Sequence, residues 1–326
     1  MRAAFYELNG YAREVLKIGE VDTPQPGPGE VRVKLVASGV NPSDVKARAG
    51  STRKIAYPQV IPHSDGAGEI DMVGEGVPAA RLGERVWLWN AQWLRAFGTC
   101  AEYIALPSEQ AVRLPANVGF DVGACLGIPA MTAFHAVAVA RAAPGMTLLI
   151  AGGAGAVGHY AVQFAKVAGA SVIATVSSPE KAKAALAAGA DHTIDYKRDS
   201  VGEQAMAITG KKGVDGIIEL DIAANANLIP QVLRPRGTVV VYGTGAMEAE
   251  VPLFFLLRNA IALKFIYVYE LDAAERTAAL TGIERALATG KLITDIGAVF
   301  PLAETAAAHE AVEQGKVLGN VVVKIA

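Results

Sequence analysis

The stretch that decides the fold is TLLIAGGAGAVGHYAVQFAKVA, residues 147–168. It opens with a short apolar run, residues 147–151, of the kind that forms a buried parallel strand. It then passes through a glycine-rich turn into an amphipathic helix, which we expect to begin near Ala156. A strand, a glycine turn and a helix in this order predict one unit of a parallel sheet with a helix packed against it.

The glycines of this turn fit the spacing G-x-G-x-x-G, with Gly153, Gly155 and Gly158 in the three positions. In such a motif the first glycine permits the tight turn and the second lets the backbone approach a pyrophosphate. The third lets the helix pack closely on its strand. The free N–H groups of the helix N-terminus, at Ala156 and Val157, attract an anion. The turn therefore predicts a dinucleotide-binding site.

The pattern of the chain changes near Asp121. Before this point, strand-like segments separated by turns predict a small β-rich, barrel-like domain; the segments are residues 3–6, 31–38, 68–73, 85–88 and 101–105. After it, helical patterns alternate with β-branched runs, which predicts a doubly wound parallel sheet. The expected strands are residues 171–176, 192–194, 214–220, 238–242 and 263–268. The expected helices are residues 156–168, 180–188, 201–209, 224–233, 253–259 and 273–289.

Composition excludes several classes of protein. With 326 residues, 52% of them hydrophobic, the chain is long enough for two domains with ample cores. A net charge of −2 gives no basic surface for nucleic acid or anionic membranes. The N-terminus lacks the apolar core of a signal peptide, and the apolar stretch 251–269 is interrupted by Arg258, Asn259 and Lys264, so we expect no membrane span. Two cysteines, Cys100 and Cys125, predict no disulfide framework and fit a reducing cytoplasm.

The end of the second strand of the sheet bears on the choice of nucleotide. An NAD site usually ends this strand with a carboxylate that binds the ribose 2′-OH. Here the strand ends in Ser177 and Ser178, with Lys181 one turn into the next helix, which suits a 2′-phosphate; Tyr196 would close the adenosine side. These residues favour NADPH over NADH. The alternative, which is compatible with it, is that the serines cap the helix and Lys181 is solvated.

Four further motifs precede the glycine turn in order: GVNPSDVKARAG (39–50), IPHSDGAGEI (61–70), FGTCAEY (97–103) and LGIPAMTAFHAV (126–137). With them, essentially the whole chain resembles the medium-chain dehydrogenase/reductase superfamily, and within it the zinc-free quinone oxidoreductase (zeta-crystallin-like) branch. The resemblance implies an α/β fold in which a Rossmann doubly wound parallel sheet is inserted into a β-rich GroES-like catalytic domain. The catalytic domain would be residues 1–123 with 270–326 returning to it, and the NADP-binding domain residues 124–269. Hydride transfer would take place in the cleft between them.

The resemblance also bears on metal. Zinc-dependent relatives carry a cysteine where Asn41 stands and a histidine–glutamate pair where Ser64 and Asp65 stand. An amide and a hydroxyl do not hold zinc, so we expect no metal, and His63 beside this position is interpreted as a structural residue. Without a Lewis acid to activate an alcohol, the expected chemistry is reduction of an electron-poor acceptor.

The resemblance implies roles for further residues. Asn41 would lie near nicotinamide and substrate, although with Pro42 it is also a good turn former. The cofactor contacts would come from Thr132, Tyr242, Gly243, Thr244, Tyr267, Val268 and Asn320; Thr132 has helix capping, and Tyr242 core packing, as alternatives. Lys46 replaces a tyrosine of the relatives, so it is interpreted either as a donor to an oxyanion or as a solvated helix residue. The tryptophan-rich segment 87–96 suits a planar acceptor, core packing or a dimer contact.

Together these features predict an NADPH-dependent, zinc-independent, cytoplasmic reductase of small planar quinones. The alternative of the same fold reduces the C=C bond of enones, 2-alkenals or enoyl thioesters. A third alternative is an NADPH-binding structural or RNA-binding protein, against which the near-neutral charge argues. The relatives pair their last Rossmann strand across a two-fold axis, and an exposed strand edge is an aggregation hazard. We therefore expect a homodimer through residues 263–268.

Overall fold

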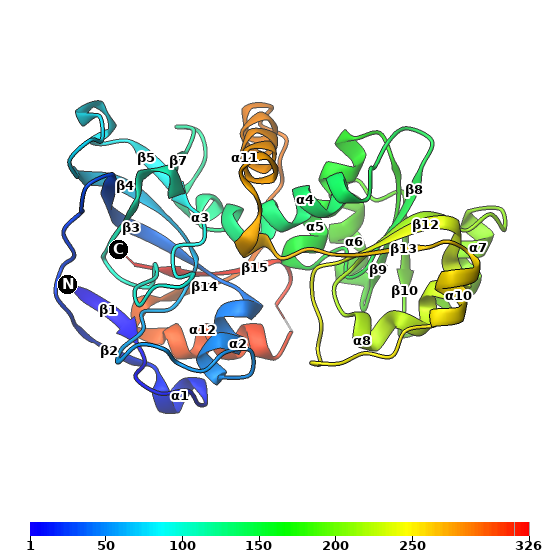
Figure 1. Ribbon diagram of the computed structural model, residues 1–326, viewed down its shortest axis with the longest axis horizontal. Helices are drawn as coiled ribbons and strands as arrows, with labels where there is room; N and C mark the ends of the chain where they lie inside the picture. Colours follow the sequence, from blue (N-terminus) through cyan, green and yellow to red (C-terminus); the bar gives the residue numbers. More distant parts are fainter. Residues whose placement is uncertain (316, 326) are drawn as a thin grey trace. The chain divides into compact units, whose positions relative to one another are not determined.

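The computed structural model describes residues 1–315 and 317–325, and the chain divides into two compact units (Figure 1). Unit 1 consists of Met1–Pro129, Leu287–Gly290 and Thr294–Ala326, and unit 2 of Ala130–Ala286 and Lys291–Ile293. The α/β fold with a doubly wound sheet inserted in a β-rich unit is confirmed. The chain returns to unit 1 later than residue 270, because helix α11 (Ala273–Ala288) packs on α4 (Met131–Val139). The two helices approach so closely that a Cβ added at Gly282 would lie 2.0 Å from the Phe134 ring.

Unit 2 is organised around six parallel strands in the order β10-β9-β8-β11-β12-β13. The strands are β8 (Thr147–Ile150), β9 (Ser171–Val176), β10 (His192–Asp195), β11 (Val214–Glu219), β12 (Leu233–Val241) and β13 (Ala262–Phe265). Strand order reverses between β8 and β11, so the crevice at their carboxyl ends is the place where doubly wound sheets bind ligands.

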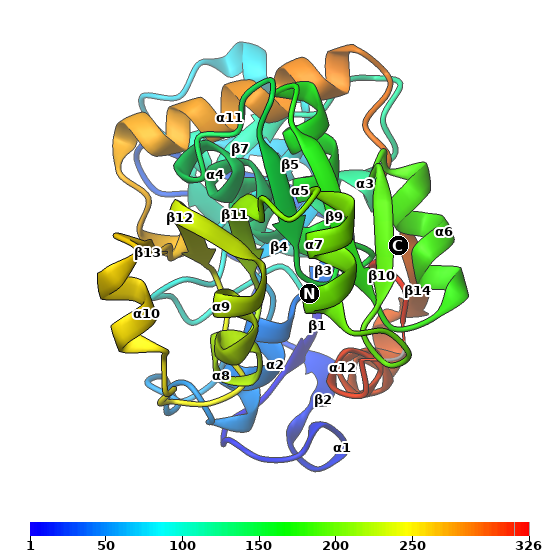
Figure 2. The same cartoon turned by 90° about the vertical axis from the view of Figure 1, so that its right-hand side faces the viewer.

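Helices cover both faces of this sheet (Figure 2). Right-handed crossovers place α5 (Ala156–Val167) and α6 (Pro179–Ala187) on one face, and α7 (Val201–Ile208) and α9 (Ile229–Val232) on the other. The second face holds a hydrophobic core of the unit. Its buried members include Leu149, Ile173, Ala205, Ile217, Ile229, Val232 and Val239.

Besides shifts of element ends, such as that of β12, which begins at Leu233 rather than at residue 238, two predicted elements of unit 2 differ from the structure. The helix expected over residues 224–233 is broken into α8 (Ile222–Asn225), a 3-10 turn (Ala226–Leu228) and α9. Pro230 explains the break, because it has no N–H for the preceding turn and its ring crowds a carbonyl there. The last strand, expected over residues 263–268, ends at Phe265, because its partner β12 ends at Val241, which pairs with Phe265. Tyr267 and Val268 therefore lie outside the sheet.

Unit 1 is built on a seven-stranded sheet in the order β14-β15-β3-β4-β5-β7, with β6 also pairing β3. The strands are β3 (Glu30–Val40), β4 (Asp65–Val73), β5 (Arg85–Leu88), β6 (Tyr103–Pro107), β7 (Ala111–Arg113), β14 (Ile296–Pro301) and β15 (Asn320–Lys324). A separate antiparallel pair joins β1 (Arg2–Phe5) to β2 (Lys17–Glu20). Thus the long central strand β3 pairs with the last strand of the chain.

Short helices complete the two units. Those of unit 1 are α1 (Ala12–Val15), α2 (Pro42–Ala49), α3 (Phe120–Gly123) and α12 (Thr305–Glu313), and α10 (Leu253–Arg258) precedes β13 in unit 2. Single-turn 3-10 helices are Ala79–Arg81, Ser108–Gln110, Val268–Glu270 and Leu302–Glu304, and a π-turn spans Leu126–Ala130. Over residues 1–315 and 317–325, none of the helices combines the length and the apolar character that crossing a bilayer requires.

Candidate functional site

The glycine turn connects β8 to α5, and its three glycines have different surroundings. A Cβ added at Gly158 would lie 2.2 Å from the carbonyl oxygen of Gly152, and one at Gly153 would lie 2.5 Å from the Cβ of Ala174. These two glycines are required by packing within the protein. A Cβ at Gly155 would meet only the Gly152 oxygen, at 3.3 Å, and Gly155 is exposed. The open surface at Gly155 is therefore the one that suits the approach of a pyrophosphate.

The N-terminus of α5 provides donors beside this surface. Gly155 is the N-cap residue, and the first α-helical hydrogen bond runs from the His159 N–H to the Gly155 carbonyl. Ala156 and Val157 lie in the first turn, where backbone N–H groups have no helical acceptor. These residues fit a dinucleotide in both shape and donor set.

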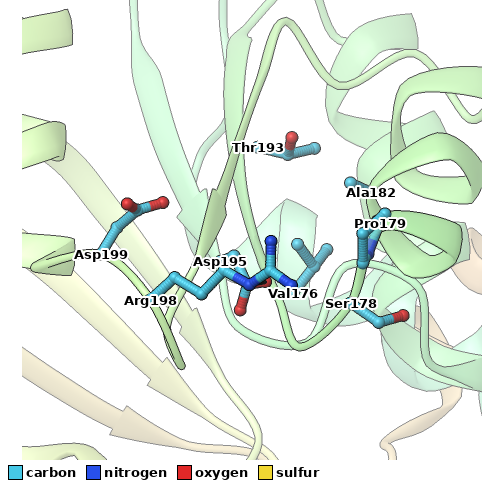
Figure 3. Close-up of a pocket in the computed structure, with 8 residues that line it drawn as sticks. All are labelled: Val176, Ser178, Pro179, Ala182, Thr193, Asp195, Arg198 and Asp199. Atoms are coloured by element: carbon cyan, nitrogen blue, oxygen red, sulfur yellow. Dashed lines mark ion pairs between the residues drawn. The ribbon is translucent and has the colours of Figure 1, made fainter.

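A pocket of about 380 Å³ opens at the carboxyl ends of β9 and β10 (Figure 3). Its lining residues are Val176, Ser178, Pro179, Ala182, Thr193, Asp195, Arg198 and Asp199. Ser178 caps α6, since its Oγ accepts from the Lys181 N–H at 3.3 Å, so the capping interpretation of this serine is confirmed. Ser177 and the Lys181 side chain are half-buried near this helix end, and Tyr196 is 53% exposed after β10.

Asp195 and Arg198 in this pocket are residues that the sequence analysis missed. The Arg198 Nε lies 3.7 Å from an Asp195 carboxylate oxygen, and in Figure 3 the arginine side chain runs alongside Asp195 toward Val176. The signal was available, because neighbouring parallel strands end at the same edge and β10 is expected next to β9. Arg198 thus places a second positively charged side chain in the region where the sequence predicted only Lys181.

The loops that follow β11 and β12 start at the same edge of the sheet. Tyr242 follows β12 directly, and a Cβ added at Gly243 would lie 2.4 Å from the Leu220 carbonyl oxygen, so the two loops are in close contact. Thr244 is exposed, and its hydroxyl donates to the Ala246 carbonyl at 2.8 Å. Burial raises the pKa of Tyr242, and the charge of Glu219 adds to the effect.

Glu219, at the end of β11, is a second residue that the sequence analysis missed. It is 3% exposed, and its Oε1 accepts from the Asp221 N–H at 2.7 Å and from the Asn225 side chain at 2.8 Å. Burial raises the pKa of Glu219, and these hydrogen bonds act in the opposite direction. A buried carboxylate at the strand-order reversal therefore holds the loop that leaves β11.

The remaining predicted cofactor residues lie in three places. Thr132 is 5% exposed in α4, Tyr267 is half exposed after β13, and Val268 next to it is buried. Asn320 lies in unit 1 at the start of β15, where its Nδ2 donates to the Asp295 carbonyl at 3.0 Å. The structure thus gives the Asn320 amide a partner within its own unit.

Asn41 is the centre of a buried polar group in unit 1. It is 4% exposed at the N-cap of α2, and its Nδ2 donates to an Asp65 carboxylate oxygen at 2.7 Å. The Asn41 backbone N–H donates to Asp44 at 2.8 Å. The other Asp65 oxygen accepts from the Ile128 N–H at 2.8 Å, and a Cβ at Gly127 would lie 2.1 Å from that oxygen. Asp44 and Asp65 therefore fix the position and orientation of the asparagine.

The two carboxyl groups have perturbed titration. Burial raises the pKa of Asp44 to about 7. The hydrogen bond from the Asn41 N–H and the charge of Arg53 act in the opposite direction and lower this pKa. Burial, with the charge of Asp44, raises the pKa of Asp65 well above its usual range.

These residues do not fit a zinc ion. The amide of Asn41 occupies one Asp65 oxygen and the Ile128 N–H the other, and Ser64 offers a hydroxyl. Among the described residues, no group of three or more His, Cys, Asp or Glu side chains is arranged to hold a metal.

His63 belongs to a buried network that also reaches the Asp65 carbonyl through Ser38 and Thr99. Its Nδ1 is hydrogen-bonded to the Ser38 hydroxyl at 2.8 Å and its Nε2 to the Nε2 of His309 at 2.9 Å. His63 adopts φ = 79°, the left-handed region that favours glycine. Burial lowers the pKa of His63 to about 3 and, together with the charges of His63 and Arg48, lowers that of His309 well below its ordinary value. His309 was missed because 246 residues separate it from its partner.

Lys46 lies in the middle of α2 and is half-buried, and its carbonyl accepts from the N–H and the hydroxyl of Ser51. In the tryptophan-rich segment, Trp87 and Trp89 are 1% and 5% exposed. Core packing is therefore the correct interpretation for these two tryptophans, and only the later part of the segment reaches the surface.

Counted from β8, the strands of unit 2 have the order 3-2-1-4-5-6, and the glycine turn follows the first of them. This arrangement, together with a β-rich unit that carries a buried asparagine, defines a dinucleotide-binding oxidoreductase of two units. Comparison with family models agrees: residues 27–116 match "Alcohol dehydrogenase GroES-like domain", and residues 156–284 match "Zinc-binding dehydrogenase". The chain belongs to the medium-chain dehydrogenase/reductase superfamily.

Individual relatives span nearly the full length. A 2-haloacrylate reductase from Burkholderia sp. is 30% identical over 93% of this chain and 93% of its own. The quinone oxidoreductase of Rattus norvegicus is 33% identical over 91% and 89%. Among solved structures, one titled NAD-dependent alcohol dehydrogenase has a TM-score of 0.92 at 28% identity, covering all of both chains. Escherichia coli quinone oxidoreductase complexed with NADPH has a TM-score of 0.89 at 25% identity, also covering all of both chains.

Proposed function

We propose that this oxidoreductase uses NADPH to reduce quinones without zinc. The observation that carries the proposal is the Asn41–Asp65 hydrogen bond of 2.7 Å, which occupies the place of the zinc ligands with an amide and a carboxylate. The quinone oxidoreductase relatives and the solved NADPH complex support it.

The nucleotide would be held by residues of unit 2. The N–H groups of Ala156 and Val157 and the open surface at Gly155 suit the pyrophosphate. Lys181, Ser177, Tyr196 and Arg198 suit the adenosine ribose and its 2′-phosphate, because two cations and hydroxyls at the end of β9 and after β10 favour a phosphate over a hydroxyl. NADPH, when bound, supplies a hydride to the acceptor.

Asn41 is the residue that we assign to the acceptor. An amide nitrogen carries two N–H donors, and one of them is committed to Asp65 at 2.7 Å. The second lies beside Asp44, whose pKa the Asn41 side chain lowers through a hydrogen bond, and it would turn from Asp44 to the oxygen on which negative charge develops when a quinone or enone takes up hydride. Asp65 and Asp44 are positioning residues, because they act through Asn41.

Reduction of a conjugated C=C bond is the second candidate. It is supported by the name of one relative, 2-haloacrylate reductase, whose substrate is an alkene. Both candidates need a donor at the developing oxyanion, and Asn41 serves either.

Steady-state NADPH oxidation by the metal-free protein separates these candidates. The panel is 1,4-benzoquinone, 9,10-phenanthrenequinone, 2-hexenal and crotonyl-CoA, each with NADPH and with NADH. Fast turnover of the quinones supports the first candidate, and preference for the alkenal or thioester supports the second. NADPH binding without turnover of any acceptor would contradict both and favour a binding protein.

We further propose a cytoplasmic homodimer formed through β13 and α10. Strand β13 is the edge of its sheet, and α10 exposes Leu253, Phe254 and Leu257, each more than 70% accessible. Phe265 on β13 is 68% exposed, so this face combines a free strand edge with apolar side chains. Light scattering should give a dimer mass for the wild type and a monomer mass for Phe254→Asp; a wild-type monomer would refute the proposal.

A further inference from the structure

Arg53 of unit 1 has a guanidinium whose position is fixed by a buried side chain. Its Nη2 donates to the Oε1 of Gln92, which is 4% exposed. The Gln92 Nε2 in turn donates to the Arg95 carbonyl at 2.7 Å, which sets the orientation of the amide. A long, flexible arginine is thereby ordered, and ordering such a side chain has an entropic cost that a solvated residue does not bear.

The ring of Trp93 supports the same guanidinium. The Cζ of Arg53 lies 5.4 Å from the centre of that ring, within the range of a cation–π contact. The segment that carries Trp93 is itself held in place, because the Tyr57 hydroxyl donates to the Leu94 carbonyl at 2.6 Å. Leu94 and Phe97 of this segment are exposed, so the segment that carries Trp93 also presents apolar surface.

The charge of Arg53 acts on the residues that fix Asn41. It lowers the pKa of Asp44, the carboxyl that accepts from the Asn41 backbone N–H at 2.8 Å. Arg53 belongs to none of the ion pairs found within residues 1–315 and 317–325. It is half-buried, so the guanidinium combines partial desolvation with several N–H donors that Gln92 does not use.

A fixed guanidinium beside an aromatic ring matches a planar conjugated acid. The planar guanidinium of an arginine binds a carboxylate through two parallel N–H···O hydrogen bonds. When the face of the guanidinium stacks on an aromatic ring, the N–H groups at its edge can still make these hydrogen bonds. We propose that Arg53 is a specificity residue of the acceptor site, and that the preferred acceptor bears a carboxylate on the conjugated double bond that receives the hydride. This inference rests on the second candidate function, reduction of a conjugated C=C bond, and narrows its acceptors to unsaturated acids.

The reaction balances as a two-electron reduction. With the reduced nicotinamide dinucleotide bound, a hydride would add to the β-carbon of the unsaturated acid, the alkene carbon bonded to the carboxylate-bearing α-carbon, and the π electrons of the C=C bond would move toward the carboxylate. A proton from water then adds to the α-carbon, which leaves a saturated acid and the oxidised dinucleotide. Negative charge grows on the carboxylate during the first step, where the cation of Arg53 stabilises it.

The test compares 2-chloroacrylate with its methyl ester, which has the same double bond without the charge. For wild type, Arg53→Gln and the control Lys54→Gln, the ratio of kcat/KM for the acid to that for the ester is measured. Lys54 is an exposed cation next in the chain. We expect Arg53→Gln to lower the ratio about 10- to 100-fold, the loss typical of a hydrogen-bonded charge pair, and Lys54→Gln to leave it unchanged. Equal losses on acid and ester would make Arg53 a structural residue and overturn the proposal.

A binding measurement keeps this inference separate from the reductase function. Binding of the saturated acid, 2-chloropropanoate, is followed by tryptophan fluorescence in wild type, Arg53→Gln and Lys54→Gln. We expect binding to be weakened at least tenfold only in Arg53→Gln, even if no acceptor is turned over. If the wild type neither binds the acid nor reduces 2-chloroacrylate while it reduces quinones, Arg53 does not select anionic acceptors and the proposed function stands without this inference.

Discussion

Replacing Gly155 by valine should abolish nucleotide binding while leaving the protein folded. Gly155 has φ = −80°, a conformation that any residue adopts, and its added Cβ would meet one atom, at 3.3 Å. We therefore expect the free energy of unfolding to change by less than about 1 kcal/mol, because loss of glycine freedom in the unfolded chain offsets the tight contact. The valine side chain would fill the surface that the pyrophosphate must approach.

The expected effect on binding follows from the hydrogen bonds lost. Backbone N–H groups that donate to a charged group contribute about 1.5–3 kcal/mol each. Losing two of them costs about 3 kcal/mol or more, which corresponds to at least a hundredfold weaker affinity for NADPH.

Gly158→Ala is the matched comparison. Its Cβ would lie 2.2 Å from the backbone oxygen of Gly152 and 2.8 Å from the carbonyl carbon, so the strand and helix must separate. Overpacking of this kind costs about 1–3 kcal/mol, and the melting temperature should fall by several degrees.

Thermal unfolding with and without NADPH distinguishes the two variants. At a hundredfold excess over Kd, a ligand stabilises the folded state by about 2.7 kcal/mol, so the wild type should show a clear upward shift. Gly155→Val should melt near the wild-type temperature and show no shift. A normal NADPH shift in Gly155→Val would refute the assignment of this turn to the pyrophosphate.

Three further predictions concern other parts of the molecule. Lys181→Ala should weaken NADPH binding about tenfold and leave NADH binding unchanged, with Lys183→Ala as the control on the same helix; equal losses for both nucleotides would exclude a 2′-phosphate contact. Asn41→Ala should lower kcat about 10- to 100-fold with NADPH affinity preserved, as measured by stopped-flow and titration; an unchanged kcat would remove Asn41 from the reaction. Because the pKa of His309 is lowered on folding, the unfolded chain binds the extra proton, and the stability contribution of this histidine is lost as pH falls below about 6.5. Between pH 7.5 and 5 the wild type should therefore lose about 2 kcal/mol more than His309→Gln, since Asp44 titrates in both proteins; parallel curves in urea unfolding would contradict this.

The sequence predicted unit 2 more closely than unit 1. Strand β9 was predicted to the residue because its buried run is bounded by clear turn signals, and α5 differs by one residue at its end. Strand β2 was missed, because KIGE is mostly exposed and has no alternating apolar pattern. A strand of this kind is held by its backbone partner β1 rather than by its own side chains.

The site was predictable where a local motif carries the chemistry. The glycines and the N-cap serine of α6 follow from spacing along the chain, whereas Arg53 and Gln92 meet only in the fold, 39 residues apart. The same holds for Asn41 with Asp65 and for His63 with His309. Sequence patterns identify residues that act through their neighbours in the chain, and long-range polar pairs need the structure.

The pairing of β3 with β15 has a consequence for how the chain is made. Val40 pairs with Val321, so the central sheet of unit 1 is incomplete until the chain has been synthesised beyond residue 321. At about 5–20 residues per second, the intervening chain takes on the order of tens of seconds to synthesise. Unit 2, which lies almost entirely between these strands in the sequence, is complete earlier. The nucleotide-binding unit can therefore fold on the ribosome first, while the edge of β3 that pairs with β15 stays unpaired until that strand has been synthesised, and an unpaired strand edge is a template for wrong pairing.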